Sequence, residues 1–519
     1  MYSYEDVWNA IEVLKSEKSG WFWKKEKPEE KFKALEVIAK AGHANSIYSL
    51  LPFLKFNNEE LRNAVCDTII TLFKKIDDRK GYYNTLKHCS ISRKDLDYYE
   101  TVFDKDRFFY LLALSSLNGN GYLREVAVQK LAKTGNSLAI PFTIYRLADW
   151  VLPVRQAALK GIKAFANKAY IDALIANLPA FEWLLEVQRT DLRSTYEDII
   201  TFLMNGNRDY ILTNFRGYED RLRFLLAKHI SYALGSSREL QMLLEDRYFM
   251  IRKLTLDHFE NLTESQIECL LQDRSAGIRQ ETLYRLKENE NFEAVLKRFI
   301  ADDSATIRNY ARYYLKHTDM DFAAFYHDKL KSEHQITGAL MGLAEISAVA
   351  YRNDVLTYTE HHDLKIKKSA FNALCILDEE AAYEFGLKNM DTPFTGLRNQ
   401  ITNFLSGIPR EEILIRARII YNTGSDELKL SMLRLYGKTG GWKVLADLMS
   451  ATTEQSREIR ELANVYLQNW RTKAIHLYTN PTEAERNLMR EVFARVTAQH
   501  EQMKYFNNNP VHDLYFYFK

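Results

Sequence analysis

The sequence is poor in the residues that interrupt regular structure. Its 519 residues include 20 Gly and 9 Pro, about 4% and 2%, against a typical usage of about 7% and 5%. That shortage excludes a turn-rich β-sandwich, a collagen-like chain and a proline-rich disordered chain. The 31 Tyr, 28 Phe and 46% hydrophobic content exclude disorder over most of the length. We therefore predict an all-α protein.

Cysteine pairs, net charge and long apolar runs are also lacking. The four cysteines, Cys66, Cys89, Cys269 and Cys375, are scattered with no C-x-x-C pair, which argues against a disulfide framework or a zinc knuckle. The 71 Lys+Arg nearly cancel the 69 Asp+Glu, so no global field attracts nucleic acid or an anionic membrane. No stretch approaches the roughly 18 apolar residues of a membrane span, and the first residues lack a leader pattern. We expect a cytoplasmic protein with no membrane span.

What the sequence does contain is a repeat. An aliphatic residue precedes a basic one, and small or apolar residues follow the basic one by three and by seven positions. The basic residue stands at Arg62, Arg124, Arg155, Arg193, Arg223, Arg252, Arg279, Arg308, Lys367, Arg398, Lys429 and Arg460. From Arg124 on, most steps are 27 to 31 residues and one is 38, while the gap of 59 after Arg308 holds a degenerate copy at Ile336-Thr337. Positions four apart share one side of a helix, so each copy predicts a helix with one buried face.

Another apolar periodic run precedes each copy, as in Phe292, Val295, Leu296 and Phe299. Each repeat is therefore predicted to be two antiparallel helices joined by a tight turn. Two short helices cannot bury their apolar faces alone, so the pairs must stack on one another. We predict a right-handed α-solenoid, a superhelix of about 12 to 13 hairpins with a long concave groove.

Two further columns carry a family resemblance. An Asp stands six residues before the basic position at Asp149, Asp246, Asp273 and Asp302, and a Gly stands eleven after it at Gly135 and Gly440. With these columns the chain resembles HEAT-repeat proteins, in the bacterial PBS-lyase HEAT-like form of the armadillo-like repeats, over about residues 31 to 470. The resemblance is weak from 74 to 107 and around 337. It implies a structural ladder between repeats, formed by Asp149, Arg155, Asp246, Arg252, Asp273, Arg279, Asp302 and Arg308.

The ends and one interruption set the predicted domain boundaries. Residues 1–30 are expected to form a capping helix and a linker that holds the aromatic cluster 20–25. Residues 31–470 form the repeats, with an irregular insertion at 74–107. Residues 471–519 form a capping helix, which begins at Pro481 and the capping box Thr482-x-x-Glu485, and an aromatic tail. That tail either folds back onto the last repeat or docks elsewhere.

The exposed side of each second helix is the predicted binding surface. Positions +1 and +5 from the basic residue lie opposite the core column. The candidate partner-binding residues are Lys160, Lys228, Lys253, Tyr284, Asn309, Tyr313, Asn372, Asn399, Asn403 and Arg434. Amides, tyrosines and scattered charge suit a polar peptide or a folded protein better than a polyanion. The leading hypothesis is a non-catalytic scaffold or adaptor that binds a protein or an extended peptide along the concave face.

Two alternatives remain open at this point. One is a nucleic-acid-binding protein that resembles the HEAT-like DNA glycosylases, although the Arg-rich residues 207–316 carry 18 Lys+Arg and 17 Asp+Glu. The other is a regulatory subunit of a modifying enzyme. We found neither an HExxH nor a GxSxG motif, and we predict no enzyme activity, no cofactor and no metal site. The identity of the partner and the oligomeric state stay open.

Overall fold

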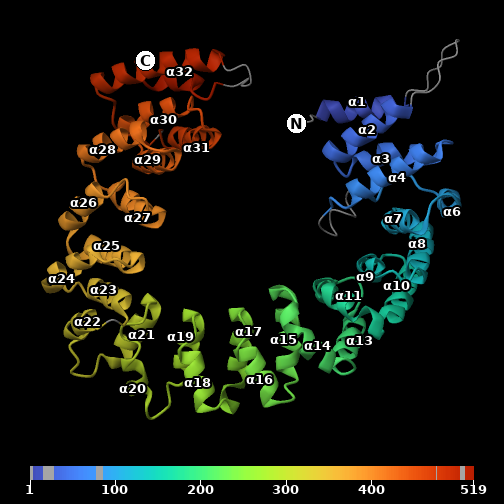
Figure 1. Ribbon diagram of the computed structural model, residues 1–519, viewed down its shortest axis with the longest axis horizontal. Coiled ribbons are helices and arrows are strands. Elements are labelled where there is room, and N and C mark those ends of the chain that lie inside the picture. Colours follow the sequence, from blue (N-terminus) through green and yellow to red (C-terminus); the bar gives the residue numbers. More distant parts are fainter. Residues whose placement is uncertain (1–3, 16–27, 77–85, 333, 475, 503–508) are drawn as a thin grey trace. The chain divides into compact units, whose positions relative to one another are not determined.

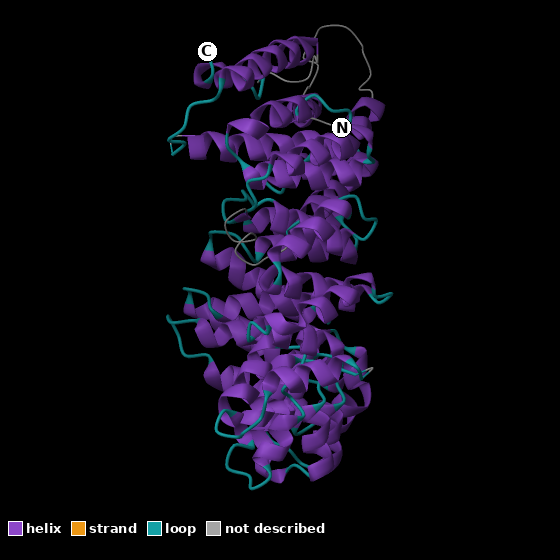
Figure 2. Cartoon of the chain, turned by 90° about the vertical axis from the view of Figure 1, so that its left-hand side faces the viewer, coloured by secondary structure: helices purple, strands orange, loops and turns teal. Residues whose placement is uncertain are grey.

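The chain folds into helices and short turns. A computed structural model describes residues 4–15, 28–76, 86–332, 334–474, 476–502 and 509–519, and these residues contain no strand (Figures 1 and 2). The chain divides into two compact units, Met1–Gln266 and Ile267–Lys519. The predicted all-α class is confirmed.

The first unit contains a series of helical hairpins. Its helices are α1 (Tyr4–Lys15), α2 (Pro28–Ala41), α3 (Ser46–Leu50), α4 (Glu59–Phe73), α6 (Arg93–Val102), α7 (Lys105–Ser115), α8 (Gly121–Lys133), α9 (Ile140–Leu147), α10 (Leu152–Phe165), α11 (Ile171–Ala176), α12 (Leu178–Glu182), α13 (Arg193–Met204), α14 (Arg208–Asn214), α15 (Asp220–Tyr232), α16 (Ser237–Leu244) and α17 (Phe249–Leu254). Helix α18 (Glu264–Leu271) contains the boundary between the units.

The second unit continues the same pattern. Its helices are α19 (Ala276–Arg285), α20 (Phe292–Lys297), α21 (Ala305–Leu315), α22 (Phe322–Leu330), α23 (Ile336–Glu345), α24 (Arg352–Thr357), α25 (Leu364–Leu377), α26 (Glu379–Lys388), α27 (Thr395–Leu405), α28 (Glu411–Thr423), α29 (Asp426–Thr439), α30 (Leu445–Ala451), α31 (Arg457–Ala474) and α32 (Glu483–Gln502). The second helices of its hairpins, α19 to α31 in odd numbers, pack side by side in one layer. Figure 1 shows α24, α26 and α28 in the other layer.

Local sequence explains where the second helices begin and what they bury. Each basic residue of the repeat lies in the first two turns of such a helix. In α8, the side chain of Asn120 accepts a hydrogen bond from the Tyr122 N–H at 3.0 Å, which caps the helix. Leu123, Ala127 and Leu131, the three core positions of this copy, are at most 3% exposed. The predicted hairpin with a single buried face is therefore confirmed.

Part of the expected irregular insertion at 74–107 is helical, which corrects that expectation. Ser92 and Asp95 form a capping box at the start of α6, with the Ser92 N–H donating to Asp95 at 2.8 Å. Asp104 then caps α7 by accepting from the Arg107 N–H at 2.9 Å. Two of the acidic residues of this stretch, Asp95 and Asp104, therefore act in helix caps. Residues 77–85 lie outside the described residues.

Both ends of the chain pack on neighbouring repeats. Val7 and Leu14 of α1 are buried, and α1 packs on α2. The aromatic cluster predicted at 20–25 lies outside the described residues. At the other end the aromatic tail folds back, because Tyr517 contacts Trp470 of α31 at 5.3 Å between ring centroids and Phe518 is fully buried.

Acidification is expected to loosen the C-terminal helix. His500 of α32 is buried and its Nε2 lies 2.9 Å from Thr452 Oγ1, while burial lowers the pKa of the imidazole. The unfolded state then binds the proton more readily, so the stability contributed by neutral His500 is complete above about pH 6.5 and is lost as the pH falls below it. Amide protection factors of α32 should therefore fall between pH 7 and pH 5.5. The variant His500→Gln should flatten this dependence, whereas His512→Gln, which alters an exposed histidine, should leave it unchanged.

Candidate protein-binding face

Three arginines of the repeat join one hairpin to the next. The Arg124 Nη1 donates to the Asn118 carbonyl of its own turn at 2.9 Å, and its Nε and Nη2 donate to Asp149 of the next repeat at 2.8 and 2.7 Å. Arg223 binds Asp246 in the same way, at 3.0 and 2.9 Å, and Arg279 binds Asp302 at 2.9 and 2.6 Å. Such two-pronged ion pairs are directional as well as strong.

The carboxylates of this ladder also hold the hairpin turns. Asp149 accepts from the Val151 N–H at 2.9 Å and from the Arg146 guanidinium at 2.7 Å. Burial alone would raise the pKa of Asp149, but the hydrogen bonds from Arg124 and from Val151, together with the charges of both arginines, outweigh it and lower that pKa. Because the bound guanidiniums are buried and neutralised, these arginines offer little to a phosphate backbone.

The other predicted ladder arginines also bind the carbonyl of their own turn, but one of them has a different partner in the next hairpin. Arg155 and Arg252 donate to the carbonyls of Asp149 and Asp246 in their own turns, each at 2.8 Å. Arg308 likewise donates to the Asp302 carbonyl at 2.6 Å, but its other nitrogens bind Glu345 at the end of α23. The slot that holds an Asp in other repeats is occupied here by Lys331, so the ladder as predicted is broken at the degenerate copy.

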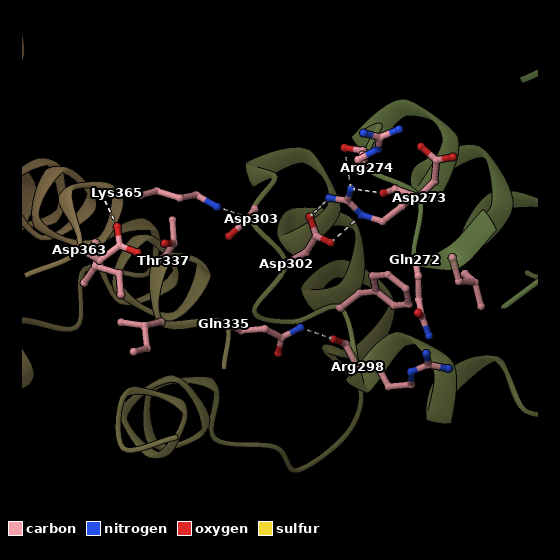
Figure 3. A pocket seen from close by; sticks show the side chains of 15 residues that line it. Gln272, Asp273, Arg274, Arg298, Asp302, Asp303, Gln335, Thr337, Asp363 and Lys365 are labelled. Atoms are coloured by element: carbon pink, nitrogen blue, oxygen red, sulfur yellow. Dashed lines mark hydrogen bonds and ion pairs between the residues drawn. The ribbon is translucent and has the colours of Figure 1, made fainter. Parts of the chain in front are cut away.

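A hollow of about 690 Å³ accompanies this break in the second unit (Figure 3). Thr337 lines it at the position where other repeats carry a long basic side chain. Lys365 pairs with Asp303 across it at 2.6 Å, and Asp302 is held by Arg279. The charges that line the hollow therefore largely neutralise one another, and the described residues provide no nucleophile with an adjacent base there.

The predicted partner-binding residues lie at the surface, as positions +1 and +5 require. Eight of them are exposed, namely Lys160, Lys228, Lys253, Tyr284, Asn309, Tyr313, Asn399 and Asn403, while Asn372 and Arg434 are half-buried. Three have polar contacts: Asn309 accepts from Arg312, Asn403 accepts from Lys438, and the Lys228 Nζ lies 3.8 Å from Glu182. We call the surface carrying positions +1, +5 and +9 of the second helices the second-helix face.

In the first unit this face contains a groove between α8 and α10. It encloses about 460 Å³ and its floor consists of small residues, including Ala132, Ala157 and Gly161. Gly161 permits the close packing, because a Cβ there would lie 3.0 Å from the Ala132 Cβ. Lys133 and Lys160 stand on opposite rims. Two cations therefore flank a shallow channel with a small-residue floor.

The sequence analysis predicted only one of the two rim lysines. Lys160 is a predicted residue, whereas Lys133 lies at position +9 and falls outside the two columns used. One more helical turn along the same face would have identified it. The depth of the channel depends on Gly161, whose role follows from packing against α8, which no column reveals.

Neither metal-ligand clusters nor helices suited to span a membrane occur among the described residues. They contain no group of three or more His, Cys, Asp or Glu side chains able to hold a metal ion. No helix within the described ranges is both long and apolar enough to cross a bilayer.

Comparison with known proteins gives weak structural matches alone. No family model matches the chain, and no curated protein does. Among solved structures, Kap121p matches with a TM-score of 0.35 and 12% identity over 98% of this chain and 68% of that one. Importin beta matches with a TM-score of 0.30 and 10% identity over 96% of this chain and 70% of that one. An engineered protein gives a TM-score of 0.17 and 14% identity over 90% and 99% of the two chains. Such low scores assign neither family nor function. The helical hairpins and the three Asp–Arg pairs of this chain are those expected from its resemblance to HEAT-repeat proteins.

Proposed function

We propose that this protein is a non-catalytic scaffold that holds an extended segment of a partner protein on its second-helix face. The observation that carries the proposal is the groove between α8 and α10. Its small-residue floor admits a polypeptide backbone, and its rims place two lysines on either side. We also propose that the repeats belong to the short PBS-lyase HEAT-like form, on the basis of their 27- to 31-residue steps.

The charge of this groove favours an acidic segment. Lys133 and Lys160 are exposed and have no ion pair or hydrogen bond among the described residues. Glu125, at the same groove, already accepts a hydrogen bond from Gln129 at 3.1 Å. The groove therefore offers two unpaired positive charges to one partly satisfied negative charge, and opposite charge across an interface sets both the rate of association and the choice of partner.

Reversing the two rim charges is expected to abolish partner binding. The tagged full-length protein would be recovered from its native cells after nuclease treatment and a moderate salt wash. We expect the wild type to retain a stoichiometric protein partner. The amount of partner recovered with the double variant K133E/K160E should be at least tenfold lower, because two attractive contacts become repulsive. The matched control is K105E/K168E, which reverses two exposed lysines outside the groove and should retain the partner.

Two results would refute the proposal. One is recovery of nucleic acid without a stoichiometric protein, lost as the salt concentration rises. The other is equal retention of the partner by both double variants.

A further inference from the structure

Two adjacent second helices of the second unit present the same three side chains in the same order. Counted from the basic residue, position +1 is an amide, position +5 a tyrosine and position +8 a lysine. In α19 these are Gln280 and Tyr284, followed by Lys287 in the turn after the helix. In α21 they are Asn309 and Tyr313, followed by Lys316 at the helix C-cap. The two tyrosines are 63% and 61% exposed. Since α19 and α21 pack together, the two sets form parallel rows across the second-helix face.

An aromatic base holds these rows in place. Tyr310 and Tyr314 of α21 lie 4.7 Å apart between ring centroids, and Tyr314 contacts Phe292 at 5.7 Å. Tyr313 packs on Tyr314 at 5.2 Å. Burial raises the pKa of Tyr310 to about 12, with Tyr314 and Tyr284 adding to the effect. Tyrosines supported in this way contribute a large contact area with little loss of side-chain freedom on binding.

The lysines beside them are free to pair with an acidic partner. The Lys316 Nζ lies 4.5 Å from the centroid of the Tyr313 ring, and the Lys287 Nζ lies 5.7 Å from that of Tyr314. Neither has a carboxylate partner among the described residues. Two nearby acids are already engaged, Glu281 by Arg285 at 3.2 Å and Glu293 by His317 at 2.9 Å. The exposed Glu288 and Glu290 follow Lys287 along the chain.

The spacing expected for two packed helices favours one backbone conformation of a bound segment. Packed helices lie about 8 to 10 Å apart. A polyproline II segment has three residues per turn and rises about 3.1 Å per residue, so it presents the same face about every 9.3 Å. A β-strand presents the same face every second residue, about every 6.6 Å, and would be out of register with the second row. Lys287 and Lys316 lie just past the C-terminal ends of the two helices, beyond the tyrosines, so the lysines contact a second row of residues.

We propose that α19 and α21 dock an acidic polyproline II segment. Prolines at every third position pack on Tyr284 and Tyr313, as proline-rich segments do on exposed aromatic side chains. Acidic residues at the neighbouring positions pair with Lys287 and Lys316. This inference rests on the proposed function, for which it supplies the chemistry of the bound segment in the second unit.

A peptide is favoured here over single-stranded nucleic acid. Bases would also stack on exposed tyrosines, but strand binding needs a basic groove that follows the backbone. The two lysines belong to residues 207–316, which contain 18 Lys+Arg and 17 Asp+Glu. This nearly neutral region lacks the excess of positive charge that strand binding needs.

Fluorescence polarisation with the full chain tests this proposal. The probes are three labelled 12-mers: (Pro-Glu-Pro)₄, (Pro-Lys-Pro)₄ and an oligothymidine. We expect (Pro-Glu-Pro)₄ to bind at least tenfold more tightly than either of the others. The variant Y284A/Y313A should weaken that binding at least tenfold, whereas Y284F/Y313F should keep it within about threefold, since the ring faces are retained. K287E/K316E should reverse the preference toward (Pro-Lys-Pro)₄. The matched control Y122A/Y232A removes two tyrosines that are 85% and 94% exposed elsewhere and should have no effect.

Equal binding of the two peptides, binding of neither, or tighter binding of the oligothymidine would overturn the proposal. These results are distinguishable from failure of the proposed function. If the peptides failed to bind as expected but the native partner still depended on Lys133 and Lys160, the proposed scaffold function would stand and only the polyproline II site would be refuted.

Discussion

Replacing Asp149 with Asn should lower the local free energy of unfolding around α8 to α10 by about 3 to 5 kcal/mol. The side chain of Asp149 is fully buried between Arg124 and Arg146, which are 7% and 5% exposed. Asparagine keeps the shape but removes the charge, so two buried guanidiniums lose their shared counter-ion. Since contacts in a repeat array are local, the loss of stability should be confined to the helices near Asp149.

Hydrogen exchange measured helix by helix is the suitable readout. Amides of α8 and α10 should exchange faster in Asp149→Asn, while those of α27 and α29 should be unchanged. The control is Asp191→Asn, because Asp191 pairs with Arg193 at the surface, where both side chains are more than 60% exposed. Exposed pairs contribute at most about 1 kcal/mol. If Asp149→Asn behaved like this control, the ladder would not stabilise the stack.

Asp149→Asn should also remove the dependence on acidic pH of the local stability around α8 to α10. Because the folded state lowers the pKa of Asp149, its stabilisation is complete above the unfolded value of about 3.9 and is lost as the pH falls below it.

Replacing Gly338 with Ala should destabilise the region around α23 by about 1 to 3 kcal/mol or more. A Cβ at this position would lie 2.0 Å from the Ala301 carbonyl oxygen and 2.7 Å from that of Asp302. Both atoms are backbone, so α23 itself would have to move. Alanine is otherwise favoured over glycine inside a helix by about 1 kcal/mol, and a net loss of stability therefore measures the clash.

The matched control for this substitution is Gly396→Ala in α27. There the nearest atom to an added Cβ is the flexible end of Lys368, at 3.2 Å. Thermal unfolding and exchange of the α21 and α23 amides should separate the two variants, with Gly396→Ala at or above wild-type stability. Equal stability of the two variants would mean that α23 does not depend on its close approach to Ala301.

The repeat columns made the hairpins predictable, because each column is a periodic apolar position within one helix. The residues that bind the side chains of these columns were harder to predict from the sequence. The Asp149 site includes Arg146, which belongs to no column. At the degenerate copy, where Lys331 replaces the usual Asp, Arg308 binds Glu345 instead. Two glycines, Gly338 and Gly342, let α23 approach Ala301 and the Tyr326 ring, since an added Cβ would lie 2.0 and 2.3 Å from them.

Exposure of the candidate site was predictable, but its shape was not. Positions +1 and +5 correctly placed Lys160, Tyr284 and Tyr313 at the surface. The groove beside Lys160 required knowledge of how closely α8 and α10 pack. The aromatic support beneath Tyr313 likewise comes from α20 and α21 together, through contacts between residues that share no sequence period.

At three junctions the ladder pairs an arginine with the aspartate one hairpin further along the chain, and this gives those junctions a direction and a unit of change. Removing or duplicating one whole repeat brings together an arginine and an aspartate of the same kind as before, so the joint remains chemically matched. A shorter insertion would leave a buried charge without its partner. Repeats joined in this way can be added or removed as whole modules, and the length of the surface offered to a partner can change while the junctions that carry the pair keep their chemistry.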